Sequence, residues 1–351
     1  MTDTVKPKPT SLRDIAERTG VSVMTVQRAI GAPHLVAEKT RRRILRVMQE
    51  VGYVPDRNAA SLVSRSSGLI GLVVPSATGP TFAAEVEGVA HFGRTTGRDL
   101  LLADVAGSGG SAGGDSGGSN GGEQEVLRAV LGRRPDGIVL TFSPTDAGAR
   151  ELLAQSTVPI VETWDDPAEP IDMVAGISND AAARQVARYF ANIGRRRAAF
   201  FGPPAGHART RWTAFADEWA RVTDGEAIHV PLETSGPWAQ ERFGSAPAFF
   251  DRLDGSPDGA ADCVFCSTDV TAAAVVFEAQ RRGLGVPDDL AVCGFGDLDI
   301  AASMTPALTT VSVPARDMGL QACELIAARR AKRSGPHRLL LATHLIVRDS
   351  A

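Results

Sequence analysis

Four side chains in the segment 22–31 have the types and spacing needed to read base edges of double-stranded DNA. A helix over this segment places them on one open face: Val23, Met24, Gln27 and Arg28. Arginine can make a bidentate contact with guanine, whereas valine and methionine can only contact thymine methyl groups or exclude water. The hydroxyls of Ser22 and Thr25 suit phosphate oxygens. This face therefore predicts major-groove recognition.

Two short helices joined by a glycine turn must position that face. Ser11 is a good N-cap, and Asp14 follows at the spacing of a capping box. Gly20 supplies the turn after the first helix, Ser22 caps the second helix, and Gly31 ends it. The arrangement predicts a helix-turn-helix, with an ordinary helical hairpin as the alternative.

The distribution of charge favours DNA binding at this end of the chain. The 351 residues carry a net charge of −4, which by itself argues against a general nucleic-acid binder. Residues 1–65, however, hold 12 Lys and Arg against 6 Asp and Glu, whereas the remaining residues hold 25 against 35. A basic head on an acidic body directs phosphate binding to the head.

From residue 69 onward, apolar strand patterns alternate with amphipathic helix patterns, and the alternation restarts near residue 176. We expect an α/β body with two lobes, each built on a doubly wound parallel sheet. Small ligands bind such folds at the carboxyl ends of the strands. Residues 107–122 interrupt the pattern with nine glycines in sixteen positions, which predicts a flexible Gly/Ser-rich loop rather than a phosphate-binding loop.

The chain shows no arrangement typical of an enzyme or a metal site. Cys263 and Cys266 lie in the apolar run ADCVFCS, an expected buried strand on which residues three apart point to opposite faces. The H-E-x-x-H motif is missing, no G-x-G-x-x-G follows the first strand of the body, and the six histidines show no ligand spacing. We expect no catalytic residues, no cofactor and no metal.

Neither a secretory signal nor a long apolar run is present in the sequence. The segment MTDTVKPKPTS lacks an apolar core, and no stretch of about 18 apolar residues occurs. We expect the four cysteines to be structural thiols, which is consistent with a reducing compartment. We therefore expect a cytoplasmic protein that does not contact a membrane.

The segments SLRDIAERTGVSVMTVQRAI and EKTRRRILRVMQEVGYVPDRNAASL resemble the headpiece and hinge of the LacI/GalR family of bacterial transcription regulators. The resemblance continues through RRPDGIVL, VFCSTDVTAAA, GVPDDLAVCGFGD and PALTTVSVP, so it covers nearly the whole chain. Within the family, IVETWDDPAEPIDMVAGISND is most similar to gluconate-responsive repressors. The resemblance implies a periplasmic-binding-protein-like effector domain whose chain crosses three times between the lobes.

The resemblance places Val23 and Met24 at the base-reading positions and makes Arg28 a further base contact. Gln27 stands where the family usually has serine, so it either adds a polar contact or is merely tolerated. In the hinge, Leu62 takes the position of a leucine that wedges into the minor groove, with an interdomain packing residue as the alternative. The two residues expected to accompany this wedge on DNA are Asn58 and Ala59.

In the effector domain, Arg211 takes the position of the arginine that holds effector hydroxyl or carboxylate groups in the family. Arg209 lies two residues earlier and is a second candidate. Gly296 stands where many members have a ligand-gripping aspartate, which leaves Asp297 as its substitute. One fewer carboxylate beside a retained arginine favours an anionic effector.

Four further positions follow strands, where ligand-facing groups belong. Glu162, Thr268 and Asp269 offer oxygen atoms that accept hydrogen bonds from sugar hydroxyls. Phe82 follows the first strand of the body, where it either forms an apolar wall or packs in the core.

We expect five segments, with boundaries as follows: a disordered arm over 1–10, a helix-turn-helix headpiece over 11–55, a hinge helix over 56–67, an effector domain over 68–349, and within it the loop 107–122. Lobe 1 spans about 68–176 and 306–336, and lobe 2 spans about 177–305 and 337–349. No leucine heptad follows the last strand, so a homodimer is expected rather than a tetramer.

These features predict a transcriptional repressor that reads a pseudo-palindromic double-stranded operator and is released by a sugar or sugar acid such as gluconate. The alternative is a corepressor-dependent regulator that responds to a neutral sugar or a purine. An exported sugar-binding protein would share the two lobes but carry a secretion signal instead of the headpiece.

Overall fold

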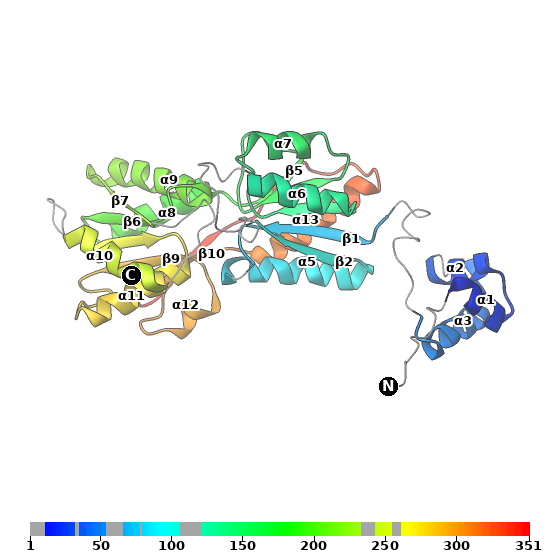
Figure 1. The fold of residues 1–351 in the computed structure, drawn as a ribbon. Coiled ribbons are helices and arrows are strands. Elements are labelled where there is room, and N and C mark those ends of the chain that lie inside the picture. Colours follow the sequence, from blue (N-terminus) through cyan, green and yellow to red (C-terminus); the bar gives the residue numbers. More distant parts are fainter. Residues whose placement is uncertain are drawn as a thin grey trace, which may run out of the picture. The chain divides into compact units, whose positions relative to one another are not determined.

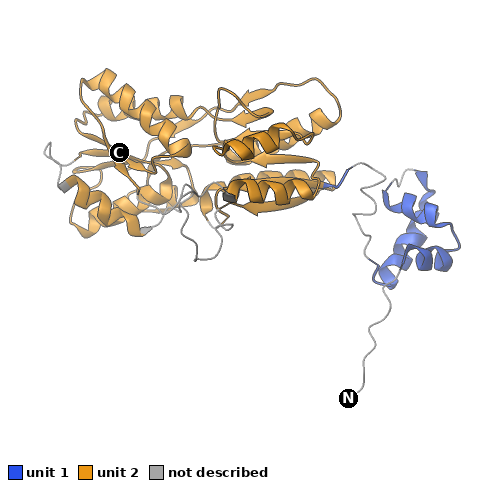
Figure 2. Cartoon of the chain, turned by 45° about the horizontal axis from the view of Figure 1, so that its top comes forward, with its two compact units in different colours: residues 1–68 blue, residues 69–351 orange. Residues whose placement is uncertain are grey.

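The computed structural model describes residues 11–31, 35–53, 66–77, 79–105, 121–232, 243–254 and 261–351. The chain divides into two compact units, Met1–Gly68 and Leu69–Ala351, shown in different colours in Figure 2. The expected arm, most of the expected hinge with Asn58, Ala59 and Leu62, and nearly all of the glycine-rich loop lie outside the described residues.

The first unit contains three helices in its described part, α1 (Leu12–Thr19), α2 (Val23–Gly31) and α3 (Glu38–Glu50). A complete capping box begins α1, because the Ser11 side chain accepts from the Asp14 amide and Asp14 accepts from the Ser11 amide. Gly20 adopts φ 65° at the C-cap, a left-handed conformation that suits glycine. Buried Ile15, Val26 and Ile44 join the three helices in one small core.

The first sheet of the body has the strand order β11-β5-β4-β3-β1-β2, and all of its neighbouring strands are parallel (Figure 1). Its strands are β1 (Leu69–Val74), β2 (Asp99–Asp104), β3 (Gly137–Leu140), β4 (Ile160–Thr163), β5 (Met173–Gly176) and β11 (Arg338–Leu340). The helices of this lobe are η2 (Pro80–Phe82), α5 (Ala83–Thr96), α6 (Gly121–Gly132), α7 (Ala147–Ala154) and α13 (Ala315–Arg330). Helices α5 and α13 pack together over one face of the sheet, and residues of α6 and α7 join the hydrophobic cluster on the other.

The second sheet has the order β12-β10-β9-β8-β6-β7, parallel except for β12, which runs antiparallel to β10. Its strands are β6 (Ala198–Gly202), β7 (Ile228–Pro231), β8 (Cys263–Cys266), β9 (Ala291–Gly296), β10 (Thr309–Ser312) and β12 (His344–Ile346). Its helices are α8 (Asn179–Asn192), α9 (Gly206–Thr223), η4 (Phe243–Ser245), α10 (Ala246–Asp254), α11 (Asp269–Arg281) and α12 (Asp299–Ser303).

The chain crosses three times between the lobes, after β5, after β10 and after β11. The expected lobe boundaries at 306 and 337 are wrong in detail, because β10 pairs with β9 in the second sheet and β11 pairs with β5 in the first. The sequence pattern carried no information about which of the two sheets these segments would join.

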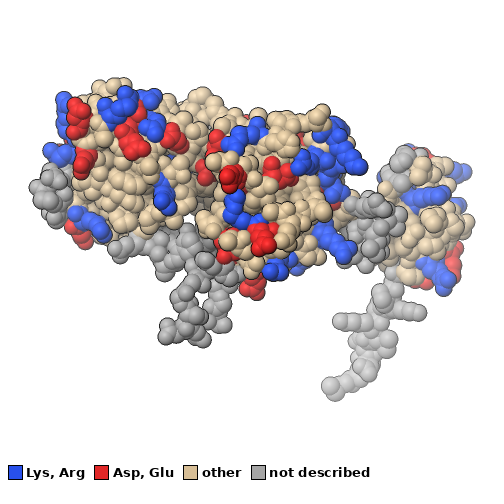
Figure 3. All heavy atoms as spheres, turned by 90° about the horizontal axis from the view of Figure 1, so that it is seen from above, with Lys and Arg blue, Asp and Glu red and all other residues tan. Residues whose placement is uncertain are grey.

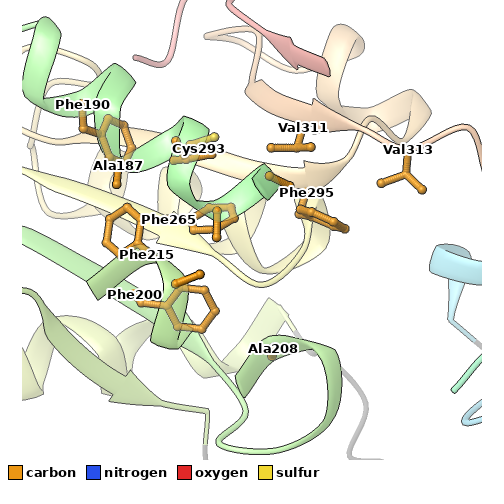
Figure 4. Close-up of a cluster of buried hydrophobic side chains, with 14 of the residues drawn as sticks. Ala187, Phe190, Phe200, Ala208, Phe215, Phe265, Cys293, Phe295, Val311 and Val313 are labelled. Carbon is orange, nitrogen blue, oxygen red and sulfur yellow. The ribbon is translucent and has the colours of Figure 1, made fainter. Parts of the chain in front are cut away.

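An aromatic core fills the space between the second sheet and helices α8 and α9. Figure 4 shows Phe200, Phe215, Phe265 and Phe295 gathered there. Cys263 belongs to this cluster and Cys266 to the cluster on the opposite face, as expected for a strand, and all four cysteines are free and buried. Among the described residues, no helix combines the length and apolar character needed to cross a membrane.

Candidate functional site

The expected DNA-reading face of α2 is open to solvent. Val23 is 37% exposed and Met24 is 56% exposed, which is unusual for apolar residues of this size on a short helix. Gln27 and Arg28 are exposed beside them, whereas Val26 and Ala29 are buried against the other helices. The core of the first unit therefore holds α2 rigidly while leaving the four candidate base-reading side chains free of packing.

The start of α2 is built by the two hydroxyl residues expected to contact phosphate. The Thr25 amide donates to Ser22 Oγ at 3.2 Å, and the two hydroxyl oxygens lie 2.9 Å apart. Ser22 thus caps the helix as predicted. The amino end of a helix favours anions, and contact of Ser22 and Thr25 with phosphate stays a prediction.

In the body, the structure places Arg211 on α9 with its side chain buried at 5% exposure. One terminal nitrogen donates to Asn179 Oδ1 at 2.7 Å, and the other donates to the Ser267 carbonyl at 3.1 Å. The guanidinium carbon lies 4.1 Å from the ring centre of Phe295, a cation–π distance. The side chain is therefore held in a fixed orientation at the carboxyl end of the second sheet.

Asn179 extends this network to the first lobe. Its Nδ2 group donates to the Trp164 carbonyl at 2.7 Å and to Asp165 Oδ1 at 3.2 Å, and both residues directly follow β4. Asp165 Oδ2 lies 3.4 Å from Nδ1 of His207 on α9, and His207 Nε2 lies 3.1 Å from the Thr141 carbonyl after β3. His207 thus joins a helix of the second lobe to two strand ends of the first.

The pKa of Asp165 reflects its position in this network. Burial alone would raise that pKa, but the hydrogen bond and charge of His207 and the hydrogen bond from Asn179 together lower it, with a further contribution from the charge of Arg211. The carboxylate form of Asp165 is therefore favoured, and it stabilises the positive side chains around it.

A second buried carboxylate orients Trp164. Glu85 on α5 is fully buried and accepts from Trp164 Nε1 at 2.5 Å and from Thr163 Oγ1 at 2.8 Å. Burial raises the pKa of Glu85 to about 7, although both hydrogen bonds lower it. The Trp164 ring meets the ring of Phe82 edge to face at 5.2 Å, so Phe82 both lies beside the strand ends and packs against the cores of the two lobes.

Thr268 and Asp269 are occupied by contacts within the second lobe. Thr268 caps α11, since its side chain accepts from the Thr271 amide. The two Asp269 oxygens accept from Thr310 Oγ1 at 2.5 Å and from the Leu298 amide at 2.6 Å, and burial raises the pKa of Asp269 to about 6. These partners give both residues a structural role, and contact with an effector stays a prediction.

The remaining expected effector residues do not gather around Arg211 through any contact in the described residues. Glu162 is buried and accepts from the Ile171 amide at 2.7 Å, and burial raises its pKa. Asp297 accepts from Arg348 at 2.7 Å, and Arg209 lies exposed on the first turns of α9. Gly296 adopts φ 129°, a conformation that disfavours the aspartate of other members at this position.

Sequence reasoning missed the residues that join the two lobes, namely Asn179, Trp164, Asp165 and His207, and also Glu85, which orients Trp164. Asn179 and Trp164 lie in segments already recognised as similar to the family, but their spacing to Arg211 carries no local pattern. Within the described part of the chain, no group of three or more His, Cys, Asp or Glu residues could hold a metal ion.

A helix-turn-helix with an open recognition face, joined to a two-lobed α/β body with a buried arginine network, defines a DNA-binding regulator of the kind controlled by small molecules. Residues 11–56 match the family described as "Bacterial regulatory proteins, lacI family", and residues 187–351 match the "Periplasmic binding protein-like domain". The chain is 31% identical over 328 residues to the HTH-type transcriptional regulator GntR of Escherichia coli strain K12, which covers 93% of each protein.

Solved structures agree with this similarity. A LacI-family transcriptional regulator from Silicibacter pomeroyi is 26% identical, with a TM-score of 0.82 over 97% of this chain and 99% of that one. The transcriptional regulator CelR in complex with cellobiose is 26% identical, with a TM-score of 0.65 over 97% of this chain and 100% of that one. The chain belongs to the LacI family, and it is a transcriptional regulator rather than an enzyme.

Proposed function

We propose that this chain is a repressor that binds a pseudo-palindromic operator as a homodimer and is released by a small sugar acid, gluconate or a chemical relative. The exposed face of α2 supports the first part, because it offers one arginine for guanine and two apolar side chains for thymine methyl groups. A single headpiece of three short helices presents one recognition helix, so two copies are needed to read two half-sites.

The setting of Arg211 carries the effector proposal. Its guanidinium is buried at 5% exposure, its two terminal nitrogens donate to Asn179 Oδ1 and to the Ser267 carbonyl, and it interacts through its charge with Asp165. A buried cation is stabilised by an anion that forms charge-assisted hydrogen bonds, and a planar guanidinium matches a carboxylate in a bidentate geometry. A carboxylate-bearing ligand is therefore favoured over a neutral one.

Release of the operator would follow from linkage between the lobes. Arg211 and His207 lie on the same helix, and Asn179 and Asp165 connect them to the strand ends of the first lobe. A ligand that engages Arg211 changes the free energy of this connected arrangement, so it can favour one relative position of the lobes. If that position disfavours the DNA-bound form, the ligand lowers operator affinity, and operator binding lowers ligand affinity by the same factor.

A neutral carbohydrate is the second candidate effector. The cellobiose complex of CelR shows that a structurally similar regulator takes a neutral sugar. In this chain, partly exposed Phe82 packs edge to face on buried Trp164 and offers an aromatic surface beside the polar network. Sugars pack their C–H faces on such surfaces through apolar contact.

A thermal-shift screen of the purified protein tests the effector class. The panel contains gluconate, a hexuronic acid, ribose, cellobiose and hypoxanthine. A ligand at about 100 times its Kd adds about 2.7 kcal/mol to the free energy of unfolding, which gives a shift of several degrees. We expect sugar acids alone to raise the melting temperature.

The variant Arg211→Ala is the control for this screen. It should unfold cooperatively, and its melting temperature should not shift with the same acid, because the guanidinium that binds the carboxylate of the ligand is removed. A shift produced only by neutral sugars or by hypoxanthine in the natural protein would overturn the sugar-acid proposal, while leaving the family assignment intact.

A further inference from the structure

The six strands of the first sheet begin at one common edge, because all of their neighbouring pairs are parallel. We call this the first amino edge and define it by the segments before its six strands: 66–68, 94–98, 131–136, 156–159, 171–172 and 329–337. Contacts between these segments confirm that they lie together, since the Asp136 amide donates to the Leu69 carbonyl and Arg330 donates to the Asp136 carbonyl.

The first amino edge carries a net positive charge, whereas the body as a whole carries a net negative charge. Its segments hold eight Lys and Arg against two Asp and Glu, although residues 66–351 as a whole hold 25 against 35. The two acids are already paired, Asp136 with Arg98 and Arg330, and Asp172 with Arg329. Figure 3 shows Lys and Arg spheres gathered at the corresponding end of the orange unit of Figure 2.

Five exposed cations remain beyond those pairs, namely Arg94 on α5 and two adjacent pairs, Arg133 with Arg134 and Lys332 with Arg333. Arg133 and Arg134 follow α6, and Lys332 and Arg333 follow α13. The hydrogen bond from Arg330 to Asp136 brings the two pairs to the same part of the edge. A local positive surface is therefore built from two segments that are about 200 residues apart in the sequence.

The second sheet provides an internal comparison. It shows that the helix dipole alone does not explain the positive charge of the first amino edge. Cations are favoured at helix carboxyl ends, and both sheets have helices ending at their amino edges. In the second sheet the corresponding described segments, 193–197, 221–227, 261–262, 281–290 and 304–308, hold six Lys and Arg against five Asp and Glu. Arg221 and Arg281 are paired with acids of their own helices, Glu218 and Glu278, and Arg282 is paired with Asp251 of α10. The same architecture is thus nearly neutral there.

We propose that the first amino edge is a second phosphate-contacting surface, which binds the backbone of the same DNA duplex that the headpiece reads. The chain itself supports this occupant, because the DNA-reading unit is joined to the body at Leu69, the first residue of β1 and part of this edge. Gly68 follows Tyr53 by 15 residues, so the two lie at most about 50 Å apart, which limits how far a duplex bound by the headpiece can lie from the edge. Such contacts carry no base specificity and depend strongly on salt.

The salt dependence of binding tests the proposal, which rests on DNA binding by the helix-turn-helix. A duplex carrying an operator selected from a randomised pool, with 20 base pairs of flanking DNA on each side, is titrated between 50 and 200 mM KCl. The variants are Arg133→Gln/Arg134→Gln and Lys332→Gln/Arg333→Gln. Each lost phosphate contact should reduce the slope of log K against log salt by about 0.9, which is about an eightfold loss of affinity at 0.1 M.

The matched control is Arg196→Gln/Arg197→Gln, an exposed arginine pair that precedes β6 as Arg133 and Arg134 precede β3. It removes the same charge from the second sheet, and it should leave the slope unchanged. Thermal melting of each variant establishes that it is folded. An unchanged slope in both edge variants, or an equal loss in the control, would overturn the proposal. Failure of the natural protein to select any operator would instead contradict DNA reading by the headpiece.

Discussion

The two units of this chain place their candidate recognition groups in opposite environments. In the headpiece, Met24 is 56% exposed, and its neighbours on the open face of α2 make no packing contribution to the core. In the body, Arg211 is 5% exposed and Glu85 is fully buried, and each is held by hydrogen bonds to residues far away in the sequence. The headpiece exposes its candidate recognition side chains to solvent, whereas the body buries its own.

Because of this difference, the residues that read DNA can change independently of the residues that respond to the effector. Exposed side chains can be exchanged at small cost in stability, so the DNA sequence that is read can change without a change of fold. Buried polar groups are costly to disturb, so the network around Arg211 ties ligand binding to the arrangement of the lobes. Substitutions in the headpiece should therefore change binding alone, and substitutions in the network should change stability and coupling together.

The largest expected effect is on the pH dependence of stability, through Glu85. Its pKa is raised to about 7 in the folded protein from an ordinary value of 4.5, so the folded state binds the extra proton between these values. Protonated Glu85 contributes about 3 kcal/mol to the free energy of unfolding below about pH 4.5. This contribution is lost as the pH rises toward and through 7.

Urea unfolding of the natural protein and of Glu85→Gln between pH 5 and 8 measures this contribution. Asp269 shifts in the same direction, so the difference between the two proteins isolates Glu85. The curve of Glu85→Gln should fall less steeply over this range. Parallel curves would show that Glu85 is not protonated in the folded state.

The next effect concerns Arg28. Arg28→Ala should cost about 1–3 kcal/mol of discrimination between the operator and a mismatched duplex, which is about a 5- to 150-fold loss. The melting temperature should not change, because the side chain is exposed on α2. Fluorescence anisotropy with both duplexes measures the ratio, and Arg43→Ala on α3 is the control. Equal weakening on both duplexes would identify Arg28 as a phosphate contact.

A smaller effect is expected at Thr268, where substitution distinguishes a helix cap from a contact with the ligand. Thr268→Ala should lower the free energy of unfolding by about 1 kcal/mol, because the cap of α11 is lost. Thr268→Ser should restore it, since serine is an equally good N-cap. With both variants, the ligand concentration for half-release of the operator should stay within twofold. A tenfold increase in either would instead place this hydroxyl against the effector.

The smallest effect is expected at Arg209, two residues from Arg211 and on the exposed side of α9. Arg209→Ala should change the free energy of unfolding by less than about 0.5 kcal/mol. Its melting-temperature shift with the sugar acid should equal that of the natural protein. Loss of the shift would move the ligand contact from the buried arginine to the exposed one.

The helices of the headpiece follow from the sequence because their signals are local. The capping box of Ser11 and Asp14, the turn at Gly20 and the exposed face of α2 all depend on residues within five positions of each other. The alternation of strands and helices in the body, though not every element, follows from periodicity. The sequence also predicts Arg211 as a site residue, through resemblance to the family.

The rest could not be predicted because its contacts join distant positions. His207 meets a carbonyl 66 residues away, and Trp164 meets Glu85 at a separation of 79 residues. No periodicity encodes such pairs. The same limit explains the misplaced lobe boundaries, since the partners of β10 and β11 are set by sheet packing and not by the strands' own residues.

The most direct measurement compares operator release by the sugar acid in the natural protein and in Arg211→Ala. Anisotropy of a labelled operator should give the same Kd for both proteins without ligand, because Arg211 lies in the body and not in the headpiece. With ligand at 100 times the Kd measured for the natural protein, only the natural protein should release the operator. Release of Arg211→Ala at the same ligand concentration would contradict the role given to the buried arginine.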